Sequence, residues 1–195
     1  MSTPPLTLDR AATALVLIDL QYGIVGQNVH PQPSGDVVAR CKRLAQAFRA
    51  VNAPVVVVTV GSAGDGKDML APTADSPAPA AGARPANWST VVDELDAQPT
   101  DLRIMKHQWG AFYGTELDLQ LRRRGIRTIV LAGISTNVGV ESTARDAFER
   151  GYEQVFVGDA MASPSAEAHA NTLKFTFPRI GRLRTTDDVL AAIKS

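Results

Sequence analysis

The chain has 195 residues, of which 45% are hydrophobic and 21% are charged. These proportions are typical of soluble globular proteins, and we expect one domain over residues 1–195. Lysine and arginine together number 20, aspartate and glutamate also number 20, and the formal net charge is therefore zero. A neutral chain is a poor candidate for binding nucleic acid or an anionic membrane, because phosphate neutralisation requires clustered basic side chains.

Reactive and metal-binding side chains are few. Cys41 is the single cysteine, which excludes an internal disulfide and a cysteine-rich zinc site. His30, His107 and His169 are far apart and lack metal-ligand spacing, so we predict neither a metal nor a cofactor. The N-terminal segment does not have the basic and apolar regions of a signal peptide, and no apolar run approaches the ~20 residues of a membrane span. We therefore expect a cytoplasmic protein.

The first half of the chain alternates between two patterns. Thr13–Ile18 and Val55–Val60 are continuous apolar runs, which predict strands buried on both faces. Between them, apolar residues recur at helical spacing over Asp36–Val51, while Gln21–Ser34 has the composition of a loop. Gly61–Pro85 has few large side chains and is predicted to be a long surface excursion.

The second half continues the alternation. A short helix or turn is predicted near Val91–Leu95. The further predicted strands are Leu102–Met105, Ile126–Ala132, Gln154–Val157 and Ile180–Leu183. The further predicted helices are Thr115–Arg124, Asn137–Arg150, Ser163–Thr176 and Thr186–Ile193. We expect Ser163 to be an N-cap, Pro164 to follow it at the first helical position, and Pro178 to break the chain.

Alternating strands and helices predict a three-layer α/β/α sandwich with a central, mainly parallel, six-stranded sheet of the Rossmann-like kind. Ligands in such folds bind beyond the carboxyl ends of the strands. Residues that directly follow the strands are therefore the first candidates for chemistry.

Three strand ends carry unusual residues. Asp19 follows an apolar strand, where burial would raise the pKa of its carboxyl group and suit it to proton transfer; an aspartate that caps a turn is the alternative. Lys106 could orient Asp19 or stabilise negative charge, and a solvated lysine is the alternative. After Gly133, the N–H groups at the start of a helix are suited to bind an anion.

An aromatic, glycine-containing loop follows Lys106. Trp109, Phe112 and Tyr113 are predicted to form the wall of a substrate pocket, although an interface or a small packed core would explain them equally well. Gln21, two residues after Asp19, is predicted to hydrogen-bond within the site and to bind the substrate.

Three stretches together resemble the isochorismatase-like hydrolase superfamily, which includes cysteine hydrolases such as nicotinamidase and N-carbamoylsarcosine amidase. They are ALVLIDLQ, IMKHQWGAFYGTELDLQLRRRGI and LAGISTNVGVESTARDAFERGYE. The resemblance covers almost the whole chain and implies the family's fold and its Asp–Lys–Cys triad, with Asp19 and Lys106 at the first two positions. The family motif S/T-N-x-C-V reads TNVGV here, so Gly139 stands where the family has cysteine.

The resemblance also implies details of the site. These are a non-proline cis peptide at Ile134–Ser135 and an oxyanion hole made by the N–H groups of Ser135 and Gly139. Nicotinamidase-type members carry an Asp and His metal cluster after the second strand, and the segment here contains no histidine. Isochorismatases proper also have glycine in place of the cysteine and hydrolyse a vinyl ether without a covalent intermediate. This implies Asp19 as general acid, with Lys106 as the residue that positions it.

Three functions remain open. The first is a cofactor-independent hydrolase of a small molecule such as a vinyl ether. The second is a small-molecule binding or scaffold protein that has lost its nucleophile. The third is an amidase with a surrogate hydroxyl from Ser135, Thr136 or Ser142, although the sequence places no histidine base beside them. The residues around Gly139 look more like the cysteine-hydrolase branch, and the family predicts a homo-oligomer, either a dimer or a tetramer. Cys41 is predicted to be a core residue.

Overall fold

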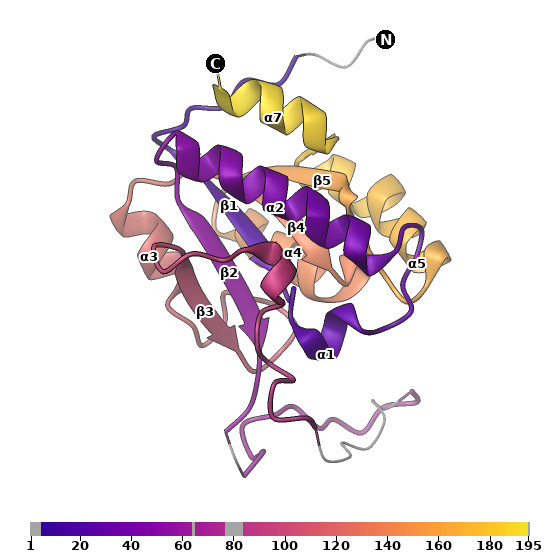
Figure 1. The fold of residues 1–195 in the computed structure, drawn as a ribbon. Helices are drawn as coiled ribbons and strands as arrows, with labels where there is room; N and C mark the ends of the chain where they lie inside the picture. The colour runs from indigo at the N-terminus through magenta and orange to yellow at the C-terminus, as the bar shows by residue number, and fades with distance from the viewer. Residues whose placement is uncertain (1–4, 64, 77–83, 195) are drawn as a thin grey trace.

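The computed structural model, shown in Figure 1, describes residues 5–63, 65–76 and 84–194. Its centre is one six-stranded sheet with the order β3-β2-β1-β4-β5-β6, and every neighbouring pair is parallel. The predicted α/β architecture is confirmed, and the sheet is entirely parallel. The strands are β1 (Thr13–Ile18), β2 (Val55–Val60), β3 (Leu102–Lys106), β4 (Thr128–Ile134), β5 (Glu153–Ala162) and β6 (Arg182–Arg184).

Helices cover both faces of the sheet (Figure 1). One buried apolar cluster joins the sheet to α2 and α7, and a second joins it to α3, α4 and α6. None of the helices among the described residues is long and apolar enough to cross a membrane. The helices are α1 (Tyr22–Val25), α2 (Ser34–Ala50), α3 (Leu117–Arg123), α4 (Glu141–Glu149), α5 (Ala166–Asn171), α6 (Phe177–Ile180) and α7 (Thr186–Lys194), with η1 (Asp93–Leu95) and the π-helical segments η2 (Thr136–Val140) and η3 (Thr172–Thr176).

The helix predicted over Ser163–Thr176 begins later than expected. Ser163 forms a β-bridge with His30 and is extended, so the helix starts only after Ser165, whose side chain accepts the N–H of Ala168 at 3.1 Å. The prediction that Pro178 breaks the chain is also wrong. It lies in the first turn of α6, which continues directly from η3, so the helical backbone passes through the proline.

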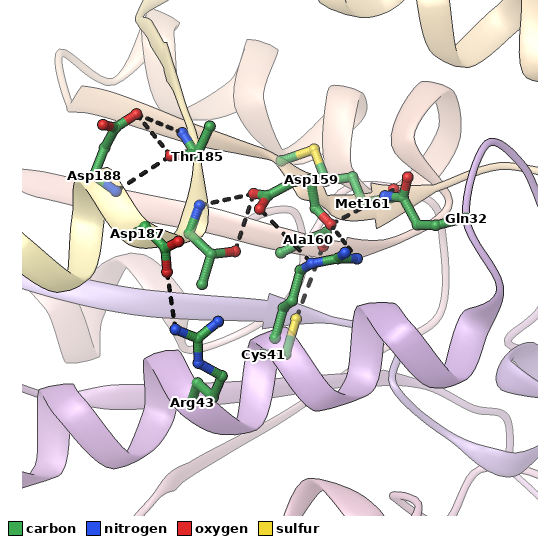
Figure 2. A network of polar contacts seen from close by, with 11 residues as sticks. Gln32, Cys41, Arg43, Asp159, Ala160, Met161, Thr185, Asp187 and Asp188 are labelled. Atoms are coloured by element: carbon green, nitrogen blue, oxygen red, sulfur yellow. Dashed lines mark hydrogen bonds and ion pairs between the residues drawn. The ribbon is translucent and has the colours of Figure 1, made fainter.

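Strand β5 is longer than predicted and runs through Asp159. Its pairing with β4 is irregular between Leu131 and Gly133, which marks a bulge in the strand. Figure 2 shows the side chains that form hydrogen bonds with main-chain groups in this region. The main-chain carbonyl of Asp159 accepts hydrogen bonds from Gln32 and Arg40, each at 3.1 Å, so α2 and the loop before it cover the bulge.

The same network fastens the last helix. Asp159 Oδ1 accepts the main-chain N–H of Thr186 at 2.7 Å and the Thr186 hydroxyl at 3.0 Å, at the start of α7. Cys41 lies beside this network, with its Sγ atom 3.8 Å from the carbonyl of Ala160. Its side chain is buried, and burial raises the pKa of the thiol well above its usual range. The prediction that Cys41 is a core residue is therefore confirmed.

The strand order of the sheet changes direction between β1 and β4. From β1 the chain proceeds to β2 and β3 on one side, and it crosses to β4 on the other. Such a switch in strand order is where parallel α/β folds bind ligands. Gly133 lets the two strands approach closely here, because its φ is +127° and a Cβ atom on it would lie 2.2 Å from the carbonyl oxygen of Ile18.

The excursion after β2 also begins at this edge of the sheet. In Figure 1 its described part extends below the sheet, away from the body of the molecule. Residues 65–76 are largely exposed, as the composition predicts, whereas residues 64 and 77–83 of this excursion lie outside the described residues.

Candidate active site

Asp19 stands directly after β1 with a left-handed backbone, at φ +55°. Aspartate tolerates this conformation better than most residues, and here its N–H is fixed by the carbonyl of Val58 at 2.9 Å. The residue is 5% exposed, and burial raises the pKa of its carboxyl group to about 6 although Lys106 opposes the change. Among the described residues, its Oδ1 atom has no hydrogen-bond partner.

Lys106 reaches Asp19 from the last position of β3. Two inter-strand spacings of about 4.8 Å separate β3 from β1, a gap that a long lysine side chain can span. The Nζ atom donates to Asp19 Oδ2 at 2.8 Å and to the carbonyl of Gln108 at 3.2 Å. With Lys106 1% exposed, the pair forms a buried acid–base unit rather than the solvated lysine of the alternative interpretation.

Gly139 faces this pair from η2, after β4. A Cβ atom on Gly139 would lie 2.9 Å from Asp19 Oδ2 and 3.5 Å from Lys106 Nζ. It would also lie 2.9 Å from Ile18 Cγ2, closer than real Cβ contacts allow. The structure therefore brings Asp19, Lys106 and Gly139 together, and only glycine fits at position 139 without a shift of its neighbours.

The turn between β4 and α4 has the expected backbone. The Ile134–Ser135 peptide is cis, as the resemblance implies. The carbonyl of Ser135 accepts the N–H groups of Val138 and Val140, each at 3.2 Å, and so begins the π-helical turn. The oxyanion hole at the N–H groups of Ser135 and Gly139 stays a prediction.

Gln21 has a different role from the one predicted. It is fully buried, and its Nε2 atom donates to the carbonyls of Val60 at 2.9 Å and Trp88 at 3.2 Å. Its Oε1 atom accepts the N–H of Val60 at 2.8 Å. Both amide protons are therefore used, and Gln21 joins the two ends of the excursion after β2 instead of offering donors to a substrate.

The three aromatic residues predicted to wall the pocket divide into two groups. Phe112 is 3% exposed and packs against Tyr152 with ring centroids 5.7 Å apart, so its ring belongs to the core. Trp109 and Tyr113 are 65% and 75% exposed. They remain free to contact a ligand.

A histidine does accompany one of the hydroxyls near the turn. His169 Nδ1 lies 2.8 Å from Thr136 Oγ1, and both residues are buried. The expectation that none of these hydroxyls has a histidine neighbour is therefore wrong; no local spacing could reveal the pair, because 33 positions separate the two residues. Burial lowers the pKa of His169, Thr136 is 0% exposed, and the contact between them joins α5 to the turn after β4.

One cavity lies near α1, and another lies near the turn after β4. One of about 510 Å³ lies between α1 and α2, and one of about 250 Å³ lies between η2 and η3. Neither is lined by Asp19 or Lys106. Within the described parts of the chain, no three His, Cys, Asp or Glu side chains are grouped closely enough to hold a metal ion.

The buried pair and the cis peptide are the features that the sequence resemblance implies, and the comparison with family models agrees with it. Residues 13–188 match the model of the isochorismatase domain. The chain belongs to the isochorismatase family. Its fold is that of an isochorismatase family protein from Burkholderia thailandensis, which is 48% identical with a TM-score of 0.93 over 97% of this chain and 98% of that one.

Relatives within the isochorismatase family differ in what their names specify. The uncharacterized isochorismatase family protein YwoC of Bacillus subtilis is 52% identical over 97% of this chain and 98% of its own length. The ureidoacrylate amidohydrolase RutB of Methylobacterium radiotolerans is 33% identical over 84% of this chain and 72% of its own length. A relative of this chain is thus named as an amidohydrolase.

Proposed function

We propose that this isochorismatase-family chain hydrolyses a small-molecule vinyl ether, such as isochorismate, by acid–base chemistry without a covalent intermediate. The observation that carries the proposal is the buried Asp19 carboxyl, with a pKa of about 6, one oxygen held by Lys106 and the other without a partner among the described residues. A carboxylic acid with a raised pKa can donate a proton near neutral pH.

The two oxygens of Asp19 have separate tasks in this mechanism. Oδ2 accepts from the Lys106 ammonium group, so the transferable proton resides on Oδ1. At pH 7, a group with a pKa of about 6 is protonated in roughly a tenth of the molecules, enough for a general acid. Lys106 fixes the carboxyl group and keeps its pKa from rising further.

The reaction balances with water as the only co-substrate. Oδ1–H of Asp19 protonates the terminal carbon of the enol ether, and the C=C π electrons form the new C–H bond. The oxocarbenium ion that results is stabilised by the Asp19 carboxylate that the proton transfer leaves. Water adds to its carbon, and its released proton returns to Asp19. The hemiketal then collapses to a ketone and an alcohol.

Gly139 favours this route over acyl transfer. It occupies the position that the family resemblance gives to the nucleophilic cysteine, and it has no side chain with which to form a thioester. The close approach of its Cα to the Asp19–Lys106 pair is possible because no Cβ is present. The N–H groups of Ser135 and Gly139 would then bind polar oxygens of the substrate, and the exposed side chains of Trp109 and Tyr113 would contact it from the surface.

Release of pyruvate from isochorismate by the purified chain tests the proposal directly. Asp19→Asn is the control, because asparagine keeps the size of the side chain but cannot donate an acid proton. Wild-type turnover well above that of the variant is expected. Equal rates for the two proteins would contradict hydrolysis of this substrate by Asp19.

Amide hydrolysis is the second candidate, because a RutB relative named as an amidohydrolase matches most of the chain. It would need a hydroxyl nucleophile, and Thr136 beside His169 is the one with a base. Mass spectrometry after incubation with an activated amide or ester would detect an adduct on that segment. The small-molecule binding alternative predicts ligand-induced shifts in melting temperature without turnover. The homo-oligomer suggested by the family stays a prediction.

A further inference from the structure

Two separate segments supply the groups around Asp19, and their relative placement determines the geometry of the site. The loop 107–116 follows Lys106 and holds its ammonium group through the carbonyl of Gln108 at 3.2 Å. The turn after β4 supplies Gly139. These segments are far apart in sequence, so a direct bond between them would fix the site as a unit.

Thr143 makes such a bond from the first turn of α4. Its hydroxyl donates to the carbonyl of Gly139 at 2.7 Å, and the same oxygen accepts the N–H of Ala111 at 3.1 Å. Thr143 is 0% exposed, and Ala111 is 0% exposed as well. One hydroxyl therefore joins the Lys106 loop to the Gly139 turn within the core.

The packing around Thr143 is equally close. A Cβ atom on Gly110 would lie 3.2 Å from Asp146 Oδ2 and 3.7 Å from Ser142, so the loop lies directly on α4. A hydroxyl bond back to the carbonyl four positions earlier is common in helices. The bond to Ala111, 32 positions away, is not explained by helix geometry.

We propose that Thr143 is a positioning residue, which sets the distance between the Lys106 loop and the Gly139 turn and so holds Lys106 against Asp19. This inference rests on the proposed function of that pair, although its structural part does not depend on the substrate. Removing the hydroxyl leaves the Ala111 N–H buried without its acceptor, and the loop would move to regain one.

The test compares three variants. Thr143→Val keeps the shape but removes the hydroxyl, and Thr143→Ser keeps the hydroxyl. Thr13→Val is the matched control, because Thr13 is also 0% exposed and its hydroxyl donates to the carbonyl of Asp9 at 2.7 Å, at the opposite end of β1. Amide hydrogen exchange at Ala111 and the NMR titration of the Asp19 carboxyl carbon are the readouts.

In Thr143→Val, exchange at Ala111 is expected to accelerate about tenfold or more. The titration midpoint of Asp19 is expected to rise by about half a pH unit or more, because the ammonium group that opposes the shift withdraws. Thr143→Ser restores both values, and Thr13→Val changes neither. With isochorismate as substrate, kcat falls about tenfold or more while KM changes little.

An unchanged Asp19 midpoint in Thr143→Val, together with a loss of thermal stability like that of Thr13→Val, would show that Thr143 is only a core residue. These two readouts need no turnover, so they decide the inference even if isochorismate is not hydrolysed. Should Thr143→Val fail to fold, wild-type exchange decides: an Ala111 amide that exchanges as fast as an exposed loop amide would overturn the inference.

Discussion

Two aspartates beside basic residues mark two very different regions of the molecule. Asp19 meets Lys106 at 2.8 Å, with side chains that are 7% and 2% exposed. Asp159 lies 3.7 Å from Arg40, with side chains that are 38% and 32% exposed. The first pair lies at the topological switch of the sheet, and the second fastens α2 and α7 to β5.

The two aspartates differ more clearly in the number of hydrogen bonds that their Oδ1 atoms accept than in their ion pairs. Asp159 Oδ1 accepts two hydrogen bonds from Thr186, whereas Asp19 Oδ1 has no partner among the described residues. Burial alone is not the distinguishing feature. Asp101 is 7% exposed, yet Arg49 holds both of its oxygens, at 2.9 and 2.7 Å. A buried carboxyl with one free oxygen is available for chemistry; a saturated one supports structure.

The largest expected effect comes from exchanging the two aspartates for asparagine. Asp19→Asn should lower kcat about 10²- to 10⁴-fold, because the general acid is lost. Asp159→Asn should leave kcat almost unchanged and lower the melting temperature. Pyruvate release and thermal melts on both variants provide the measurement. Comparable loss of activity in the two would remove the distinction drawn between these regions.

Adding one methyl group beside Asp19 should have the next largest effect. In Gly139→Ala the new methyl meets Asp19 Oδ2 and Ile18 Cγ2 at 2.9 Å, and the pair must shift. A displacement of a catalytic group by about 1 Å can lower the rate by up to ~100-fold. We therefore expect kcat to fall by about 10- to 100-fold. For the same reason, Gly139→Cys is not expected to gain amidase activity.

Gly35→Ala is the control for that change. A Cβ atom on Gly35 meets nothing within 4 Å, in the first turn of α2. Full activity is therefore expected. If Gly139→Ala were as active as Gly35→Ala, the close packing at position 139 would have no bearing on catalysis.

The pH dependence of the rate should follow Asp19. Burial raises its pKa from 3.8 to about 6, and the acid form is the active one. Activity is therefore highest below pH 6 and falls about tenfold per pH unit above it. Steady-state rates between pH 5 and pH 8, with protein stability checked at each pH, measure this slope. A rate that increases through this range would identify Asp19 as a base instead.

The smallest expected effect is on stability at the Asp159 network. Thr186→Val removes the hydroxyl bond to Asp159 Oδ1 but keeps the main-chain N–H bond. The free energy of unfolding should fall by about 1 kcal/mol, with kcat unchanged. Denaturant unfolding gives the value. A matching loss of activity would link this network to the site, contrary to the separation proposed.

Much of the fold was predictable, because continuous apolar runs such as Thr13–Ile18 and Val55–Val60 bury both faces of a parallel strand. What the pattern could not reveal depends on distant partners. The bulge in β5 relies on Gln32 and Arg40, and the extended Ser163 relies on its bridge to His30. Neither partner is near in sequence.

In the candidate site too, local sequence patterns predict some residues, whereas others depend on partners that are distant in sequence. The rule that chemistry follows strand ends found Asp19 and Lys106, which the structure joins. The sequence also predicts that Gln21 and Phe112 contact the substrate, because they lie close to those two residues in the chain. The first is saturated by main-chain groups and the second is a core ring. Thr143 and His169 act through hydroxyl bonds that no local motif describes.

The titration of the Asp19 carboxyl carbon by NMR, in the wild-type protein and in Asp19→Asn to assign the signal, is the most direct test of the general acid. A midpoint near pH 6 is expected, because burial outweighs the ammonium group of Lys106. A midpoint at or below the ordinary value of 3.8 would mean that Asp19 stays ionised throughout the neutral range, and it would contradict the account.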